Sequence, residues 1–209
     1  MQIGSKDVLI VVDVQNDFVS GSMAVADAQK IIMPINAAAE VFEHVIVVTD
    51  WHPVDHVSFA SAHPGAKDRD VVTTSYGDQT VFADHCVQGT WGAELDPGLK
   101  LTKAELTFRK GYRSGVDSYG AFYENDRDTR TGLGAYLSAR GFERVFCAGL
   151  ARYGCVLQTA LGAARDGFDV TILRDASAGD HKVEENDILI AEAGVKWANT
   201  TDLKEKAAA

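Results

Sequence analysis

Three residues that together could perform acyl transfer stand far apart in this sequence: Asp13, Lys110 and Cys155. A free thiol has a pKa near ~8.5 and is mostly protonated at neutral pH, although the thiolate is the form that attacks a carbonyl carbon. A neighbouring carboxylate can accept the proton, and an ammonium group stabilises the thiolate. The three residues therefore suit a base, a cation and a nucleophile. Taken singly, each also fits a plainer role as a turn cap, a surface charge or a small packed residue.

The sequence around Cys155 supports the role of nucleophile. Residues 144–149 form an apolar run that predicts a buried strand, and a glycine-bearing bend leads from it into a predicted helix over residues 155–166. A thiol at or near the first turn of a helix faces unpaired backbone N–H groups and the positive end of the helix dipole. Both favour the thiolate, so we expect Cys155 to be reactive.

A second group of polar residues begins at Asp50. In an extended segment Asp50 and His52, two residues apart, project to the same side, and His56 and His85 add further imidazoles. One carboxylate with two or three imidazoles suits a divalent transition metal that keeps open positions for water or substrate. The alternative is a loop whose histidines bind only backbone groups.

Several strands must end together if these groups are to meet. Apolar runs predict strands over residues 7–13, 43–50, 106–110, 145–149 and 170–175. Helical spacing of apolar residues predicts helices over about 27–42, 133–140, 155–166 and 183–193. The alternation indicates an α/β fold with a mostly parallel sheet, in which ligands bind beyond the carboxyl ends of the strands. Asp13, Asp50, Lys110 and Cys155 all stand at or just past such ends. Residues 51–105 show no strong periodicity, and residues 204–209 are predicted to fray.

Composition limits the partners and the setting. A chain of 209 residues with 46% hydrophobic content can bury a sizeable core, and we expect one domain over residues 1–209. The formal charge of −10 argues against nucleic acid or an anionic membrane as a partner, and no stretch approaches the ~18 apolar residues of a membrane span. Three cysteines and no signal peptide favour a cytoplasmic protein. A homo-oligomer is compatible with the sequence.

Five motifs, taken in order, resemble those of the nicotinamidases, which belong to the isochorismatase-like cysteine hydrolases. They are Asp-Val-Gln-Asn-Asp-Phe at 13–18, Asp-Trp-His-Pro-x-x-His at 50–56, His-Cys-Val-Gln-Gly-Thr at 85–90, Arg-Lys-Gly at 109–111 and Ala-Gly-Leu-Ala…Cys-Val at 148–156. The resemblance extends from about residue 8 to residue 176. Isochorismatases proper lack the nucleophilic cysteine and the metal ligands, so the chain is similar to the amidase branch.

The resemblance implies three layers, with a mostly parallel sheet of about six strands between helices. It implies metal-dependent hydrolysis of nicotinamide to nicotinic acid and ammonia through a thioester, with some action on pyrazinamide-like analogues. Asp13 would be the base, Lys110 the cation and Cys155 the nucleophile. The backbone N–H groups of Ala151 and Cys155 would form the oxyanion hole, next to a cis bond between Leu150 and Ala151.

The resemblance also implies one divalent transition metal, with zinc preferred to iron or manganese. Its ligands would be Asp50, His52 and His85, and His56 would be either a fourth ligand or a partner of these ligands. The metal would hold the pyridine nitrogen of the substrate and so fix the carboxamide against the nucleophile.

Two departures from the family pattern concern the substrate. The sequence Ala-Arg-Tyr-Gly-Cys at 151–155 replaces the usual Ala-Thr-Asp-aromatic-Cys, and Arg152 adds a cation that either acidifies Cys155 or changes substrate preference. Phe18 and Phe82 are expected to line the ring pocket, and Phe82 stands where many members have tryptophan. A same-family amidase acting on a different small carboxamide is therefore one alternative. A non-catalytic metal-binding or thiol-redox protein is the alternative from another class.

Overall fold

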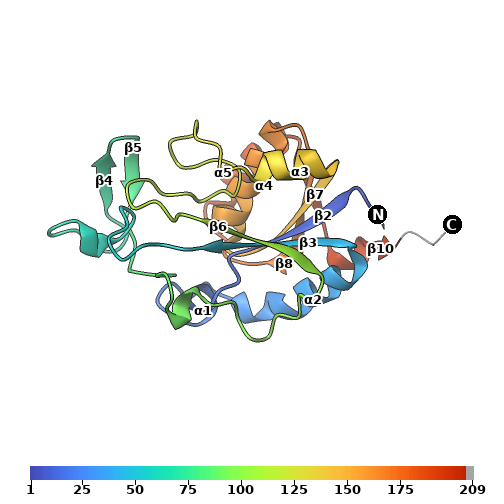
Figure 1. Cartoon of the computed structure of the whole chain (residues 1–209), viewed down its shortest axis with the longest axis horizontal. Coiled ribbons are helices and arrows are strands. Elements are labelled where there is room, and N and C mark those ends of the chain that lie inside the picture. Colours follow the sequence, from blue (N-terminus) through green and yellow to red (C-terminus); the bar gives the residue numbers. More distant parts are fainter. Residues whose placement is uncertain (206–209) are drawn as a thin grey trace.

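The sheet at the centre of the molecule has six strands, all parallel, and the computed structural model describes residues 1–205 (Figure 1). Their order across the sheet is β6-β3-β2-β7-β8-β9. In chain order they are β2 (Asp7–Val12), β3 (His44–Asp50), β6 (Ala104–Lys110), β7 (Arg144–Gly149), β8 (Asp169–Ser177) and β9 (Lys196–Ala198). The predicted mostly parallel sheet is confirmed.

Helices cover both faces of this sheet, which confirms the three predicted layers (Figure 1). On one face lie α1 (Asn16–Val19) and α2 (Ile32–Val41), and on the other lie α3 (Leu133–Arg140), α4 (Leu157–Arg165) and α5 (Val183–Glu192). Among the described residues, no helix is both long enough and apolar enough to cross a membrane.

The central strand β2 shows why its sequence is a continuous apolar run. Leu9 and Val11 pack with α2, whereas Val8, Ile10 and Val12 pack on the face covered by α3 and α4. All five side chains are fully buried. A strand with layers on both faces needs apolar residues at every position rather than at alternate ones, so the pattern of β2 identifies it as central.

The chain order places a topological switch at β2. From β2 the chain goes to β3 and β6 on one side, and later to β7, β8 and β9 on the other side. Because all six strands are parallel, their carboxyl ends lie along one edge of the sheet, at the end away from the N-terminus (Figure 1). Ligands of open α/β sheets bind at such a switch point, so the fold selects this edge for the site.

Two expected helices begin differently from the prediction. The helix expected over residues 27–42 starts with a 3₁₀ turn, η1 (Ala28–Ile31), and Pro34 lies in the first turn of α2, where its missing N–H is tolerated. The helix expected from Cys155 starts with a wide turn, η4 (Arg152–Val156), before regular helix begins at Leu157. The position of Cys155 is therefore in the turn that precedes α4.

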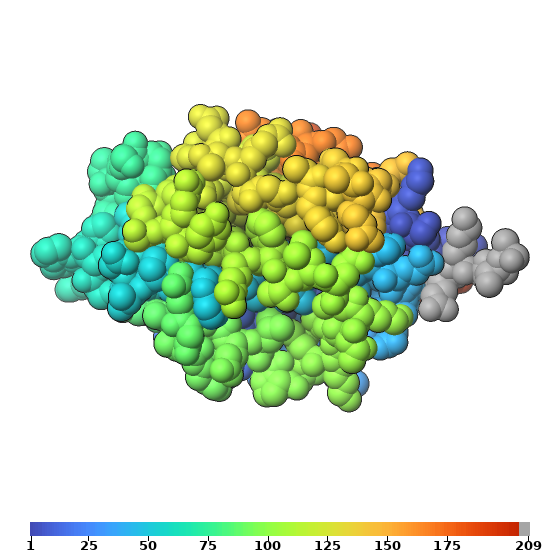
Figure 2. Space-filling model, viewed as in Figure 1, coloured from blue at the N-terminus to red at the C-terminus, as the bar shows by residue number. Residues whose placement is uncertain are grey.

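Three short pairings were missed because each is too brief to give a periodic signal. Residues 51–105 contain an antiparallel hairpin, β4 (Val71–Thr74) and β5 (Gly77–Thr80), in the segment that protrudes at one end of the molecule (Figures 1 and 2). The three-residue β9 supplies the sixth strand. The expected fraying of residues 204–209 is wrong for its first part, because β10 (Lys204–Glu205) pairs with β1 (Gln2–Ile3). Residues 206–209 lie outside the described residues.

Candidate active site

Four side chains from four strands meet at the carboxyl edge of the sheet. Asp13 follows β2, Asp50 ends β3, Lys110 ends β6, and Cys155 lies in η4 after β7. The Lys110 Nζ atom lies 2.8 Å from Asp13 Oδ2, 2.5 Å from Asp50 Oδ1 and 3.5 Å from Cys155 Sγ. The structure therefore brings together the acid, the cation and the thiol that the sequence analysis grouped.

The backbone turns sharply at Asp13 to place its carboxylate. Asp13 has a left-handed φ of 53°, which costs roughly 1–2 kcal/mol for a residue other than glycine. Its N–H donates to the carbonyl of Val48 at 2.9 Å, so the turn is tied to the neighbouring strand. Such conformations persist where the surroundings hold them and occur often at functional sites.

Lys110 is a buried cation rather than a surface charge, since only 1% of the residue is exposed. Burial alone would lower the pKa of Lys110, but the carboxylates of Asp13 and Asp50 outweigh it and raise that pKa well above its ordinary value. The ammonium group therefore stays charged. It faces both carboxylates and the thiol at the same time.

The carboxyl group of Asp13 is suited to exchanging a proton. Burial, together with repulsion from Asp50, raises the pKa of Asp13 from 3.8 to about 7, although Lys110 acts in the opposite direction. Within residues 1–205 neither of its oxygens accepts a well-directed hydrogen bond, so lone pairs remain available. A group with a pKa close to the working pH both accepts and returns protons efficiently.

The surroundings of Cys155 act on its thiol in opposite directions, and their balance does not favour the thiolate in the way that the helix position was expected to. Burial raises the pKa of the Cys155 thiol well above its ordinary value, Lys110 lowers it, and the carboxylates of Asp13 and Asp50 raise it. The position at a helix start was expected to favour the thiolate, but regular helix begins two residues after Cys155. In addition, the carboxylates of Asp13 and Asp50 face the sulfur. Asp13 offers an oxygen within 4.8 Å of the sulfur, close enough for a proton acceptor.

A carboxylate–imidazole cluster lies beside this group, with one ligand atom each from Asp50, His52 and His85 within 4.8 Å of one another. Nδ1 of His52 is 2.8 Å from the carbonyl of Gly111, and Nδ1 of His85 is 2.8 Å from that of Ala83. The Nε2 atoms are thereby directed to Asp50 Oδ2, at 3.6 Å and 4.0 Å. Metal-ligating histidines are usually fixed through their second nitrogen in this way. The donor set fits a divalent transition metal.

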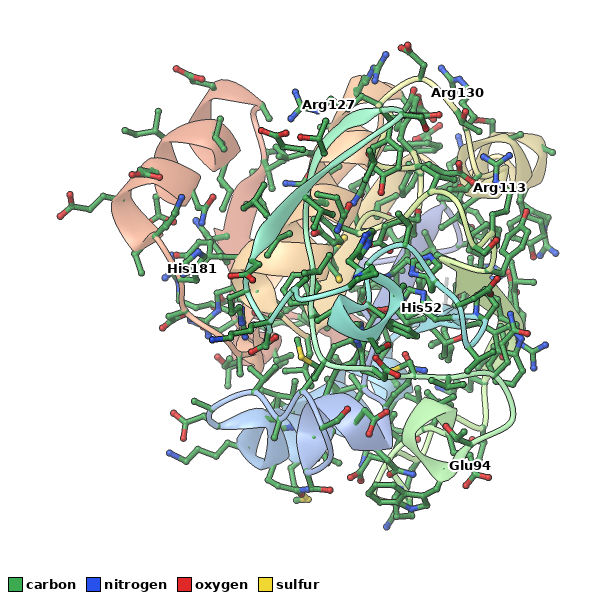
Figure 3. The ribbon with its side chains drawn as sticks, turned by 90° about the vertical axis from the view of Figure 1, so that its left-hand side faces the viewer. His52, Glu94, Arg113, Arg127, Arg130 and His181 are labelled. Atoms are coloured by element: carbon green, nitrogen blue, oxygen red, sulfur yellow. The ribbon has the colours of Figure 1, made fainter. Side chains whose placement is uncertain are left out.

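Gly111, from the Arg-Lys-Gly motif, makes the position of His52 possible. Its φ is +62°, and a Cβ atom there would lie 2.4 Å from Cε1 of His52. A side chain at this position would push the imidazole out of the cluster. Figure 3, which faces this end of the molecule, shows His52 toward the middle of the view, with Arg127, Arg130 and Glu94 nearer its edges.

His56 belongs to a neighbouring group. It clusters with His52 and Asp117 rather than with Asp50 and His85. Burial and the nearby His52 lower its pKa to about 4, and its Nε2 atom has no hydrogen-bond partner within the described residues. The sequence analysis missed the buried Asp117, because it lies in a glycine- and serine-rich loop without periodicity or motif.

The two expected ring-pocket residues flank the same imidazole. The ring centroid of Phe18 lies 5.4 Å from that of His85, and that of Phe82 lies 6.1 Å from it. Tyr119, which the sequence analysis did not single out, lies 6.3 Å from Phe82. An aromatic wall of this kind can accept a flat heteroaromatic ring next to the thiol and the cluster.

The turn that leads to Cys155 matches one expectation and does not support another. The peptide bond between Leu150 and Ala151 is cis, as the resemblance implies. Within the described residues the N–H of Ala151 has no hydrogen-bond acceptor. The guanidinium group of Arg152 binds Ser177 and Asp180 rather than Cys155. The structure therefore shows no direct contact that would support acidification of the thiol by Arg152.

Comparison with known proteins agrees with this geometry. The family model of the isochorismatase domain matches residues 7–204. The nicotinamidase of Acinetobacter baylyi is 46% identical over 169 residues, which cover 80% of this chain and 79% of that protein. The solved structure of the Acinetobacter baumanii nicotinamidase/pyrazinamidase superposes with a TM-score of 0.93 at 42% identity, covering 95% of this chain and 98% of that one.

A further solved structure bears on the metal. The pyrazinamidase of Pyrococcus horikoshii in complex with zinc has a TM-score of 0.75 and 29% identity to this chain, and the match covers 93% of this chain and 99% of that one. Together with the carboxylate–imidazole cluster, this likeness supports a divalent metal in the present chain.

We expect Lys110→Met to slow alkylation of Cys155 by iodoacetamide about tenfold at pH 7.5. Lys110 lowers the pKa of the thiol, so its removal raises that pKa by about one unit or more and reduces the thiolate fraction accordingly. Mass spectrometry of the labelled peptide measures the rate, and the buried Cys86 and Cys147 serve as internal references.

The matched control is Lys100→Met, which removes an exposed lysine and should leave the alkylation rate unchanged. If Lys110→Met, shown to be folded by circular dichroism, reacted as fast as the unaltered protein, Lys110 would have no electrostatic role at the thiol.

Proposed function

The chain belongs to the isochorismatase family, and within that family we propose that it hydrolyses nicotinamide to nicotinic acid and ammonia. The observation that supports this most strongly is the meeting of Asp13, Lys110 and Cys155 beside the cluster of Asp50, His52 and His85. A thiol, a base near neutral pKa and a buried cation suit attack on an amide. Nicotinamidase relatives make nicotinamide the natural choice among small carboxamides.

The first half of the proposed reaction forms a thioester. Asp13 accepts the proton of the Cys155 thiol, and the sulfur attacks the carboxamide carbon while Lys110 stabilises the negative charge. The proton held by Asp13 then passes to the amide nitrogen. The carbon–nitrogen bond breaks, ammonia leaves, and the acyl group remains on Cys155.

The second half reverses these roles. A water molecule gives a proton to Asp13 and attacks the thioester carbon. The carbon–sulfur bond breaks, the acid product leaves, and the thiolate of Cys155 recovers the proton from Asp13. In both halves the backbone N–H groups of Ala151 and Cys155 would donate hydrogen bonds to the oxyanion, which we propose as the oxyanion hole. The available N–H of Ala151 supports this assignment.

We propose that Asp50, His52 and His85 hold one divalent ion, with zinc as first choice and iron or manganese as alternatives. When bound, the ion would supply a ligand position for the pyridine nitrogen and so orient the ring. Phe18 and Phe82 would contact the faces and edge of the ring, and this would fix the carboxamide carbon near Cys155. His56 would not bind the ion itself. It would lie against the ligand His52, in the neighbouring group with Asp117.

Two further expectations stay proposals. We propose that residues 1–209 form a single domain, because the family match extends over residues 7–204. We also propose a cytoplasmic location, where the three unpaired cysteines would remain reduced. A small carboxamide is the proposed partner, and a homo-oligomer remains compatible with the sequence.

We expect Cys155→Ala to lower ammonia release from nicotinamide by at least about 10³-fold, because no other group on the site supplies the attacking sulfur. A coupled assay for ammonia measures the loss, and Cys147→Ala serves as a control that removes a buried thiol of β7 whose pKa is raised by burial alone. Near-normal turnover by Cys155→Ala would contradict the assignment.

The same assay on a panel of amides distinguishes the alternative substrate. Nicotinamide should have the highest kcat/KM, followed by pyrazinamide-like analogues. If an aliphatic carboxamide ranked first, the chain would be a same-family amidase with another substrate. If Cys155 reacted with peroxide but no amide were turned over, the non-catalytic alternative would hold.

We expect kcat/KM to fall about tenfold per pH unit on the acid side of a midpoint at or below about 7. The folded-state pKa of Asp13 is raised from 3.8 to about 7, so the base is protonated, and inactive, at lower pH. A divalent ion on Asp50 would add positive charge and move the midpoint downward. A profile flat down to pH 4 would mean that Asp13 is not the base.

We expect His85→Ala to weaken metal binding about 10- to 100-fold, so that the protein retains less metal after dialysis. Nicotinamide turnover should fall with the loss of metal. Metal analysis after dialysis measures the first effect directly, and readdition of zinc, iron or manganese to chelator-treated protein identifies the effective ion. The control is His181→Ala, which removes an exposed histidine away from the cluster (Figure 3). Equal metal content in both variants would contradict the proposed ligand set.

A further inference from the structure

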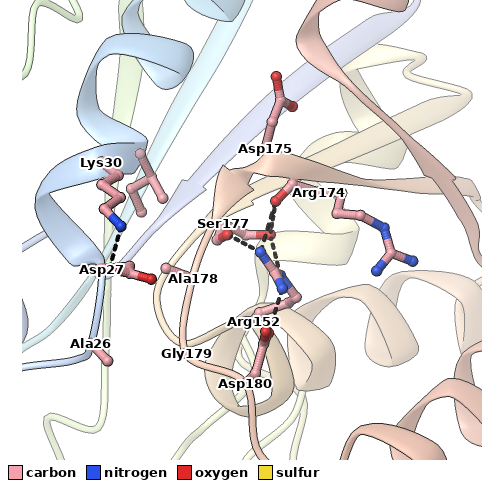
Figure 4. Close-up of a pocket in the computed structure, with 11 residues that line it drawn as sticks. Ala26, Asp27, Lys30, Arg152, Arg174, Asp175, Ser177, Ala178, Gly179 and Asp180 are labelled. Atoms are coloured by element: carbon pink, nitrogen blue, oxygen red, sulfur yellow. Dashed lines mark hydrogen bonds and ion pairs between the residues drawn. The ribbon is translucent and has the colours of Figure 1, made fainter.

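The side chain of Arg152 joins the turn before Cys155 to the end of β8. Its Nε donates to Ser177 Oγ at 3.2 Å, and its Nη2 donates to the carbonyls of Arg174 and Ser177 at 2.9 Å and 2.5 Å. Its Nη1 donates to the carboxylate of Asp180. Figure 4 shows these contacts converging on one guanidinium group. Arg152 thus binds three residues on a single segment of the chain.

The same segment also packs directly against Ala151. We call residues 177–180 the β8 loop. The N–H of Arg152 donates to the carbonyl of Ala178 at 2.6 Å. Gly179 has a φ of +94°, and a Cβ atom there would lie 2.8 Å from Cβ of Ala151. The β8 loop therefore packs against Ala151, and the hydrogen bonds of Arg152 hold the turn before Cys155 against this loop.

Arginine is well suited to holding two segments together through several hydrogen bonds. Its five N–H donors lie in one rigid plane, so binding several acceptors at once fixes both the direction and the rotation of the group. Only 14% of the Arg152 side chain is exposed, which limits competition from water. Arg152 also stands where the sequence departs from the usual family pattern.

We propose that Arg152 is a positioning residue, which holds the N–H of Ala151 in the direction that the oxyanion requires by fastening the turn to the β8 loop. This inference rests on the proposed function, because it needs a reaction with an oxyanion. The side-chain hydrogen bonds of Arg152 go to residues 174, 177 and 180 and not to the thiol of Cys155. Arg152 acts through the backbone of the residue before it.

This role predicts a separation of kinetic constants. The hydrogen bond from Ala151 to the oxyanion strengthens only as the tetrahedral state forms, so misplacing it lowers kcat and leaves substrate binding nearly unchanged. A displacement of the order of 1 Å at a reacting group costs up to about 10²-fold in rate. A purely electrostatic role of Arg152 would instead raise the pKa of Cys155 when the cation is removed.

The test compares Arg152→Met and Arg152→Lys with the unaltered, metal-loaded protein. We expect Arg152→Met to lower kcat for nicotinamide about 10- to 100-fold while KM changes less than about twofold, and Arg152→Lys to fall between the two. Alkylation of Cys155 by iodoacetamide at pH 7.5 should proceed at the unaltered rate in both variants. The matched control is Lys30→Met, which removes a cation from the same surface hollow without touching the turn.

Three results would overturn the proposal: kcat for Arg152→Met within about twofold of the unaltered value, a loss confined to KM, or slower alkylation of Cys155 in that variant. If Arg152→Met failed to fold, the double variant Ser177→Ala with Asp180→Asn would replace it, because it removes the hydroxyl acceptor of Ser177 and the negative charge of Asp180 and leaves Arg152 in place. We expect kcat of the double variant to fall about threefold or more, and an unchanged kcat would overturn the proposal.

Nicotinamide turnover by the unaltered protein distinguishes a failure of this inference from a failure of the proposed function. If that protein released no ammonia from nicotinamide, the proposed function would fail first, and the comparison would be made on whichever amide it hydrolyses. If it turned nicotinamide over normally and the Arg152 variants matched it, only the inference about Arg152 would fail.

Discussion

The buried ammonium group of Lys110 between the carboxylates of Asp13 and Asp50 is the interaction on which the site depends. Removing a charge from water costs several kcal/mol, and a buried pair persists only where the remaining charges are well placed. Here the cation lies 2.8 Å from one carboxylate and 2.5 Å from the other. Asp50 uses its second oxygen to face His52 and His85. The Cys155 thiol and the carboxylate–imidazole cluster are therefore one electrostatic unit, joined through the single carboxylate of Asp50.

The parallel sheet makes that unit possible. Asp13, Asp50, Lys110 and Cys155 are separated by up to 142 residues in the chain, yet they follow β2, β3, β6 and β7, which are adjacent in the sheet. Parallel strands end along the same edge, so one residue at each end is enough to assemble the group. The hydrogen bond from Asp13 to Val48 then sets the left-handed turn that aims the carboxylate into the site. The imidazoles of His52 and His85, by contrast, come from the long segment that follows β3 and are held by backbone carbonyls.

The assembly of the site at the ends of parallel strands explains which features of the fold and the site could be predicted from the sequence. The strand ends, and the meeting of Asp13, Lys110 and Cys155, follow from local hydrophobic patterns and the rules of parallel sheets. The three-residue β9, the hairpin of β4 and β5, and the buried Asp117 depend on tertiary contacts that leave no periodic signal. The carboxylates that act on the Cys155 thiol and the contacts of Arg152 were missed for the same reason. Each depends on groups from distant segments, Asp50 for the thiol and the β8 loop for the arginine.

A raised pKa of the Cys155 thiol is compatible with proton transfer to Asp13 when the two groups are considered as a pair. Moving the proton from Cys155 to Asp13 removes one buried negative charge and creates another within 4.8 Å of it. The net charge of the site does not change, so the transfer needs little new desolvation. Lys110 lies 2.8 Å from Asp13 Oδ2 and 3.5 Å from Cys155 Sγ, and it stabilises the anion in either position. The cost of forming the thiolate is therefore set by the difference between the two protonated forms of the pair rather than by the thiol alone.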